Sequence, residues 1–241
     1  DSNGDILAAR TGRDFKVRAV SARSRDKDRG IDISHVDWHD NPLKILSDDK
    51  IDLVIELMGG EDGIAKEFVE AALKKGKAVV TANKALLAKH GQTLAELSEE
   101  TGTPLYYEAA IAGGIPIVKS LREGLVGSRI STIAGILNGT CNYILTEMDA
   151  TGGDFGDVLQ DAQSLGFAEA DPTFDVDGID AAHKISLLAA IGFGMRPDFG
   201  SLSVDGIRNI TSEDIQNART LGYKIKLLAI ARQTDNGVLQ H

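Results

Sequence analysis

The sequence predicts an α/β protein of two domains: a parallel sheet covered by helices on both faces, followed by a domain of the α+β class. Through the first hundred residues, short β-branched runs alternate with helical runs, which is typical of a parallel sheet. This alternation ends near Gly114. We therefore expect one domain over residues 1–113 and a second over residues 114–241, which a chain of 241 residues accommodates.

The first domain is expected to alternate strands and helices. Its β-branched runs predict strands over residues 15–21, 53–57, 78–80 and 105–109. Apolar side chains recur at helical spacing over residues 64–75 and 85–100, and these runs stop at Gly76 and Gly102. Two helices are therefore expected between the strands.

The second domain is expected to mix helices and strands. Helical spacing predicts helices over residues 115–125, 141–148, 155–165, 179–191 and 211–220. Strands are expected over residues 130–137 and 223–232, and an acidic loop over residues 169–177. Ser212 is the expected cap of the last helix.

The composition narrows the range of partners. The chain carries 36 acidic against 26 basic side chains, a formal net charge of −10, which argues against nucleic acids and anionic membranes as ligands. No apolar run approaches the roughly 20 residues of a membrane span. The single cysteine, Cys141, rules out an internal disulfide framework and suits a reducing, cytoplasmic setting.

An acidic cluster is the strongest local feature. Five acidic side chains fall within twelve residues: Glu169, Asp171, Asp175, Asp177 and Asp180. The ordinary explanation is a solvated loop. A calcium loop of the EF-hand type is excluded, because Thr173 and Lys184 would stand where carboxylates are needed.

The end of this cluster suggests a ligand site. Asp180 and Lys184 are one helical turn apart in an apolar helix, so they share one face, and a buried lysine requires a partner or a task. Carboxylates beside a lysine suit a zwitterionic ligand. The acids would hold an ammonium, and the lysine would meet a carboxylate or an oxygen that becomes negative.

Three shorter segments also carry polar side chains at turns. Asn83 and Lys84 follow a predicted strand at the edge where open α/β sheets bind ligands, although this segment alone favours a strand-to-helix turn with Lys84 in solvent. Thr140 follows an Asn-Gly turn and either caps a helix or meets a ligand. Glu108 precedes the Gly113–Gly114 turn, where it would bind a cation or leave the domain crossing flexible.

Taken together, these segments resemble the homoserine dehydrogenase family. The matching segments are VTANK, YEAAIAGGIPI, ILNGTCNYIL and GFAEADP followed by DVDGIDAAHK, in order and at similar spacing. The resemblance implies a Rossmann-like dinucleotide-binding domain and a substrate domain that forms a homodimer or homotetramer. It also implies NAD(P)H-dependent interconversion of L-aspartate 4-semialdehyde and L-homoserine, in threonine, methionine and isoleucine biosynthesis.

The resemblance also implies roles for individual residues. Lys184 and Lys84 become the candidate acid/base lysines, and Asp180 lies beside the reacting oxygen and orients Lys184. Asn83, with Lys84, is placed near the nicotinamide. The implied substrate pocket is lined by Glu169, Asp175, Gly139 and Thr140. The implied site for a monovalent cation such as Na⁺ uses Glu108 and the carbonyls of Ile111, Gly113 and Ile115. Phe167 departs from the family, where many members have tyrosine.

The choice of cofactor depends on the segment after residues 15–21. An acidic side chain after the second strand of a Rossmann domain favours NAD, whereas an arginine accommodates the 2′-phosphate of NADP. Arg23 stands there, with Arg25 and Lys27 behind it. NADP is therefore the expected cofactor, with NAD as the second candidate.

Two other functions compete with this interpretation. One is a semialdehyde dehydrogenase that forms a thiohemiacetal at Cys141, although the apolar surroundings of this thiol favour a packing role. The other is a non-catalytic amino-acid-binding or regulatory module on a dehydrogenase fold.

The ends of the chain lead to one more expectation. Residues 15–21 resemble the second strand of a Rossmann domain, and residues 1–13 the end of its first helix. The first strand and its glycine-rich phosphate turn would then be missing, and the second domain would be incomplete at its C-terminus. The chain by itself is therefore expected to be inactive, or nearly so, as a dehydrogenase.

Overall fold

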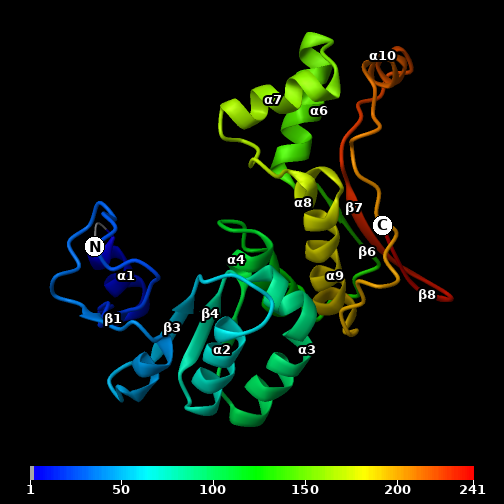
Figure 1. Ribbon diagram of the computed structural model, residues 1–241. Helices are drawn as coiled ribbons and strands as arrows, with labels where there is room; N and C mark the ends of the chain where they lie inside the picture. Colours follow the sequence, from blue (N-terminus) through cyan, green and yellow to red (C-terminus); the bar gives the residue numbers. More distant parts are fainter. Residues whose placement is uncertain (1–2) are drawn as a thin grey trace.

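The computed structural model describes residues 3–241 and contains the expected parallel sheet (Figure 1). This sheet has the order β3-β4-β5, formed by β3 (Leu53–Glu56), β4 (Ala78–Thr81) and β5 (Leu105–Tyr106). Helices α2 (Ile64–Lys74) and α3 (Lys84–Thr101) connect these strands and pack against each other. The helices expected from apolar spacing are therefore confirmed, and α3 ends where Gly102 adopts a left-handed conformation.

Only one face of β3 is buried, which corrects the expectation of helices on both faces. Val54 and Glu56 point inward, whereas Leu53 and Ile55 are 42% and 61% exposed. The reason is the placement of the helices: α2 and α3 pack against each other, and Val54 joins the core that they form. The apolar character of a strand does not show which of its faces a helix covers.

The N-terminal segment forms a small unit of its own. Helix α1 (Gly4–Thr11) matches the expected helix end, with residues 1 and 2 outside the described part of the chain. The strand expected over residues 15–21 shortens to β1 (Ala19–Val20), because Phe15 and Val17 are exposed and lie before the paired residues. It pairs in parallel with β2 (Asp37–Trp38), and the 3-10 helix η1 (Pro42–Ser47) follows; the sequence pattern predicted neither.

The crossing between the domains is helical. The strand expected to reach residue 109 ends at Tyr106, and α4 (Glu108–Ile111) begins instead. The helix expected over residues 115–125 begins later, as α5 (Ile117–Lys119), and continues as the π-helix η2 (Ser120–Gly124). Glu108 supports the later start of α5, because its carboxylate accepts hydrogen bonds from the backbone N–H groups of Val118 and Lys119.

The second domain combines helices with an antiparallel sheet of order β6-β7-β8. The strands are β6 (Thr132–Gly135), β7 (Ala229–Thr234) and β8 (Gly237–Gln240). The helices are α6 (Gly139–Thr151), α7 (Phe155–Ser164), α8 (Thr173–Val176), α9 (Ile179–Phe193) and α10 (Ser212–Thr220). The α+β class is therefore confirmed.

Several details of the second domain differ from the expectations. The last predicted strand begins only at Ala229, the acidic loop contains α8, and β8 was not predicted. The cap of α10 is Thr211 rather than Ser212. Thr211 and Asp214 form a reciprocal capping box, whose acidic partner satisfies the backbone N–H of the cap.

Helix α9 joins the two domains. Leu187 and Leu188 pack into the core formed with α2 and α3, whereas Ile185 and Ala189 pack against β7. Figure 1 shows α9 between α3 and the strands β6 and β7. The boundary at residues 113 and 114 stays a prediction.

Among residues 3–241, no helix combines the length and apolar character that crossing a bilayer requires.

Candidate active site

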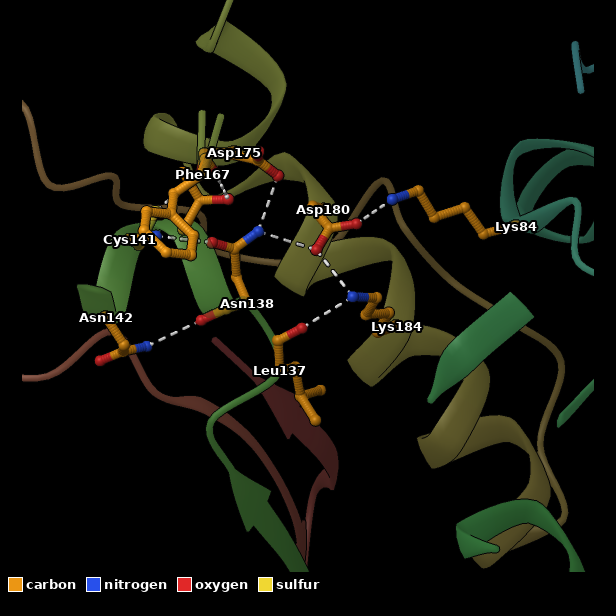
Figure 2. A network of polar contacts seen from close by, with 10 residues as sticks. Lys84, Leu137, Asn138, Cys141, Asn142, Phe167, Asp175, Asp180 and Lys184 are labelled. Atoms are coloured by element: carbon orange, nitrogen blue, oxygen red, sulfur yellow. Dashed lines mark hydrogen bonds and ion pairs between the residues drawn. The ribbon is translucent and has the colours of Figure 1, made fainter. Parts of the chain in front are cut away.

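The candidate site lies where the first turn of α9 meets the start of α3 and the end of β6 (Figure 2). Asp180 is at its centre and is only 2% exposed. One carboxylate oxygen accepts a hydrogen bond from Lys84, and the other accepts from Lys184 at 2.8 Å. The first lysine belongs to α3 and the second to α9. A single buried carboxylate therefore connects two ammonium groups from different parts of the chain.

Local sequence explains why these groups meet. Asn83 caps α3 by accepting the backbone N–H of Leu86, so Lys84 is the first residue of that helix. A cation at a helix N-terminus is disfavoured by the helix dipole, so this lysine needs an anionic partner. Gly178 caps α9 in a left-handed conformation, and a Cβ there would come within 2.8 Å of the Asp205 carbonyl. Glycine is thus required where Asp180 enters the site.

The electrostatic balance at Asp180 favours its charged form. Burial opposes ionisation, but hydrogen bonds from Lys184, Lys84 and Asn138 outweigh it, so the pKa of Asp180 lies below its ordinary value. The pKa of His183 on the same helix is lowered by burial and by the nearby Lys84 charge. His183 is therefore neutral at physiological pH and packs between the rings of Phe174 and Phe199.

Lys184 is held in a fixed direction. Its Nζ donates to the carbonyl of Leu137 at 2.8 Å and to Asp180 at 2.8 Å. An ammonium has three N–H donors. The Leu137 carbonyl and the Asp180 carboxylate are the two acceptors that Lys184 has among the described residues, so one N–H remains for a ligand oxygen.

A second carboxylate reaches the same network through Asn138. The Asn138 side-chain nitrogen donates to Asp175 at 2.7 Å and to Asp180 at 2.9 Å. The sequence pattern assigned Asn138 only to a turn. Its signal is its place as the cap of α6, where its side-chain oxygen accepts the backbone N–H of Cys141 at 2.8 Å.

Cys141 lies behind the network and is fully buried. Its thiol donates to the carbonyl of Asp175 at 3.1 Å. Burial, together with the charges of Asp175, Asp180 and Asp177, raises the pKa of this thiol to about 12. A thiolate is therefore scarce near neutral pH, and this argues against a thiohemiacetal mechanism.

The carboxyl ends of β3 and β4 form the adjoining surface. Asn83 donates its side-chain N–H to the carbonyl of Gly60 at 2.7 Å, and an added Cβ at Gly59 would meet no atom within 4 Å. The buried Glu56, which the sequence pattern did not single out, accepts the hydroxyl of Thr81 at 2.6 Å and the N–H of Met58 at 2.6 Å. Gly59 and Gly60 are exposed at this edge, where open α/β sheets bind their ligands.

Comparison with known families decides the assignment. Residues 116–240 match the family model described as homoserine dehydrogenase, and residues 4–108 match the model of the homoserine dehydrogenase NAD binding domain. The chain belongs to the homoserine dehydrogenase family. The α/β class expected from the sequence is that of an NAD-binding domain followed by the family's catalytic domain.

Individual members of the homoserine dehydrogenase family support this assignment. A homoserine dehydrogenase of Neisseria gonorrhoeae is 47% identical over 98% of this chain and 54% of the relative. The crystal structure of a homoserine dehydrogenase from Thiobacillus denitrificans superposes with a TM-score of 0.94, at 46% identity over 99% of this chain and 55% of that one. A hyperthermophilic archaeal homoserine dehydrogenase in complex with NADPH gives a TM-score of 0.70, at 28% identity over 83% of this chain and 57% of that one. The chain spans about half the length of the curated relatives it matches.

In this member of the homoserine dehydrogenase family, three expected pocket residues lie at the surface. Gly139 begins α6 and faces open space, since an added Cβ would meet no atom within 4 Å. Thr140 is half-buried and donates its hydroxyl to the carbonyl of Phe167 at 3.1 Å. Glu169 is exposed on the loop after α7, where its backbone carbonyl accepts from Gln163.

Arg23 is not part of this network. It is exposed in the loop after β1, and β1 lies beyond β3 as seen from α9 (Figure 1). The loop is held from inside by Arg29, which donates to the carbonyls of Ser24 at 2.6 Å and Lys27 at 2.7 Å. The loop therefore keeps its shape while the Arg23 side chain stays in solvent.

The expected cation site fits the structure only in part. Both oxygens of Glu108 already accept backbone N–H groups, and the carbonyl of Ile115 accepts from Ile117 at 2.8 Å. The carbonyls of Ile111 and Gly113 lie in the same turn region. These N–H groups stabilise the Glu108 carboxylate but leave its charge in place, so the cation site stays a prediction and no catalytic step is assigned to it.

Proposed function

We propose that this chain carries the active site of a homoserine dehydrogenase, which interconverts L-aspartate 4-semialdehyde and L-homoserine. The observation that carries this proposal is the buried Asp180 bound to both Lys84 and Lys184. One lysine comes from the NAD-binding part of the chain and the other from the catalytic part. A reaction between a cofactor on one domain and a substrate on the other requires such a junction.

The substrate is an amino acid, and the site has groups for both its charges. Asp175 and Glu169 are the proposed partners of the substrate ammonium. Gly139, with no side chain, leaves room for the ligand to approach the start of α6, and Thr140 adds a hydroxyl beside it. The helix N-terminus there favours a carboxylate.

The proposed chemistry takes place at one oxygen of the substrate. Lys184 directs its remaining N–H to the aldehyde oxygen, where negative charge develops during reduction. It then supplies the proton that completes the hydroxyl, and in the opposite direction it removes this proton. Asp180 pairs with Lys184 and orients it, while Lys84 is the second candidate for the same role.

Nicotinamide dinucleotide is the proposed cofactor. The match of residues 4–108 to an NAD binding domain supports it, and the archaeal relative was solved with NADPH. Asn83 and Lys84, at the carboxyl edge of β4, would hold the nicotinamide end. When bound, the cofactor supplies or accepts the hydride.

Replacing Arg23 with alanine should raise KM for NADP several-fold and leave KM for NAD almost unchanged. Arg23 is exposed in the loop after β1, where a guanidinium can bind a 2′-phosphate in bidentate fashion. Initial rates with each cofactor, in the protein expressed from its full reading frame, measure the effect, and NAD is the internal control. Equal changes with both cofactors would show that Arg23 does not contact the 2′-phosphate.

Assembly is proposed through the second domain, as a homodimer or homotetramer. Ala229 and Ala231 of β7 face α9, whereas Leu239 of β8 is exposed opposite Arg232 on the other face of the sheet. This outer face is the proposed subunit contact.

The rival functions are separated by two measurements. Homoserine-dependent reduction of NAD(P)⁺ that survives the Cys141→Ser change supports the proposal, because no thiol is then needed. Loss of turnover in this variant, together with substrate protection against iodoacetamide, would support a thiohemiacetal mechanism. Calorimetric binding of homoserine without any turnover would instead indicate a non-catalytic binding module.

A further inference from the structure

We infer that Asn138 is a positioning residue that holds Asp175 and Asp180 in their working orientation. This inference rests on the proposed function. Asn138 is 4% exposed, and its side-chain nitrogen lies 2.7 Å from one carboxylate and 2.9 Å from the other. Both N–H groups of one amide are therefore used to join two acidic side chains (Figure 2).

The orientation of the amide is determined by its other contact. The Asn138 oxygen accepts the backbone N–H of Cys141 at 2.8 Å, so the nitrogen must face the two carboxylates. The backbone carbonyl of Asn138 accepts from the side chain of Asn142, which also bonds both backbone groups of Leu227. Asn138 is thus fixed at its side chain and at its backbone.

The chemistry of the cluster explains why an amide stands here. Asp175 belongs to α8 and Asp180 to α9, and two carboxylates that share one donor repel each other. A lysine at this position would neutralise them and compete with the substrate ammonium. An amide stabilises both charges through hydrogen bonds and adds no charge of its own.

Leu137, the residue before Asn138, helps to position Lys184. Its carbonyl accepts a hydrogen bond from Lys184 at 2.8 Å. The segment that follows β6 therefore positions Lys184 through a backbone oxygen, and it positions Asp180 through the side chain of Asn138. Loss of the amide donors should disturb both ammonium binding by Asp175 and lysine orientation by Asp180.

The test compares Asn138→Asp with Asn138→Ser in the protein expressed from its full reading frame. Aspartate and serine both retain an acceptor for the Cys141 N–H, so the cap of α6 is preserved. Aspartate has the shape of asparagine but directs an oxygen at the two carboxylates. The charged or titratable groups around it are Lys84 from α3, Asp175 from α8, Asp180 and Lys184 from α9, and the Cys141 thiol from α6.

The expected result differs between the variants. Near neutral pH, Asn138→Asp should lower kcat/KM by at least about tenfold, as expected for losing a hydrogen bond to a charged group. As pH falls, its activity relative to wild type should recover in part, because the introduced carboxyl, once protonated, can again donate to a carboxylate. Asn138→Ser should raise KM for homoserine without this recovery. Wild-type kinetics in both variants, or equal losses that do not vary with pH, would overturn the inference.

A second readout does not depend on turnover. With the aspartate carboxyls labelled by ¹³C, the pKa of Asp180 should be higher in Asn138→Ser than in wild type, because one hydroxyl on a shorter side chain replaces the two N–H donors that Asp175 and Asp180 share. If this shift appears while wild-type protein shows no homoserine-dependent reduction of NAD(P)⁺, the proposed function is wrong, but Asn138 still positions Asp180. If wild type is active and the pKa of Asp180 is unchanged in the variant, Asn138 does not position it.

Discussion

Replacing Lys184 with alanine should lower kcat by about 10²–10⁴-fold, the usual contribution of an acid/base group, and should change KM for homoserine far less. The reason is geometric: Asp180 and the Leu137 carbonyl fix two of its N–H donors, and the third is directed by them. Steady-state rates of homoserine oxidation in the protein expressed from its full reading frame measure this effect. Lys184→Arg should restore the ion pair but not the rate, since arginine does not release a proton near neutral pH.

The chain offers a matched control for this variant. Lys66 and Glu70 also form a pair one helical turn apart, half-buried on α2 at 3.7 Å. Lys66→Ala removes the same group from the same kind of pair and should leave kcat within about twofold of wild type, since neither residue belongs to the network around Asp180. A Lys184→Ala protein with wild-type kcat would exclude Lys184 from the chemistry.

Replacing Asp180 with asparagine should have the second large effect. The change leaves Lys84 and Lys184 without their shared counter-ion, and breaking a buried pair from one side typically costs about 3–5 kcal/mol. The loss of the anion also removes the acceptor that orients both ammonium groups. We expect kcat/KM to drop by about 10²-fold or more, together with a lower Tm.

The control for Asp180→Asn is Asp149→Asn. Asp149 likewise pairs with two cations, Arg219 and Lys224. It belongs to the last turn of α6, where it faces the end of α10 and not α9. This variant should keep kcat/KM close to wild type while losing a surface ion-pair network. If the two variants lost activity to the same extent, the effect of Asp180 would be one of stability rather than of catalysis.

Much of the fold could be predicted from side-chain spacing. The apolar periodicity of α2, α3 and α9 is strong because each helix buries one or more faces, and burial is what selects apolar side chains. The pairing of Asp180 with Lys184 could be predicted for the same reason, because it depends only on the helical turn between them.

The parts that could not be predicted depend on contacts distant in sequence. Asn138 meets Asp180 across 42 positions, and Lys84 meets it across 96, so neither contact leaves a local pattern. The strand predicted over residues 15–21 is shorter than expected because Phe15 and Val17 are exposed and lie before the residues that pair with β2. Similarly, the exposed face of β3 depends on where α2 and α3 pack, which the sequence of the strand itself does not reveal.

The most direct test of the proposed active site is the initial rate of homoserine-dependent NADP⁺ or NAD⁺ reduction, measured by the absorbance of the reduced nicotinamide. The protein is expressed from its full reading frame and compared with the double variant Lys84→Ala/Lys184→Ala. We expect turnover in wild type, dependent on both homoserine and cofactor, and a loss of at least about 10²-fold in the double variant. Wild-type protein that binds cofactor but never oxidises homoserine, or a double variant as active as wild type, would contradict the assignment of Lys84, Asp180 and Lys184 to the reaction.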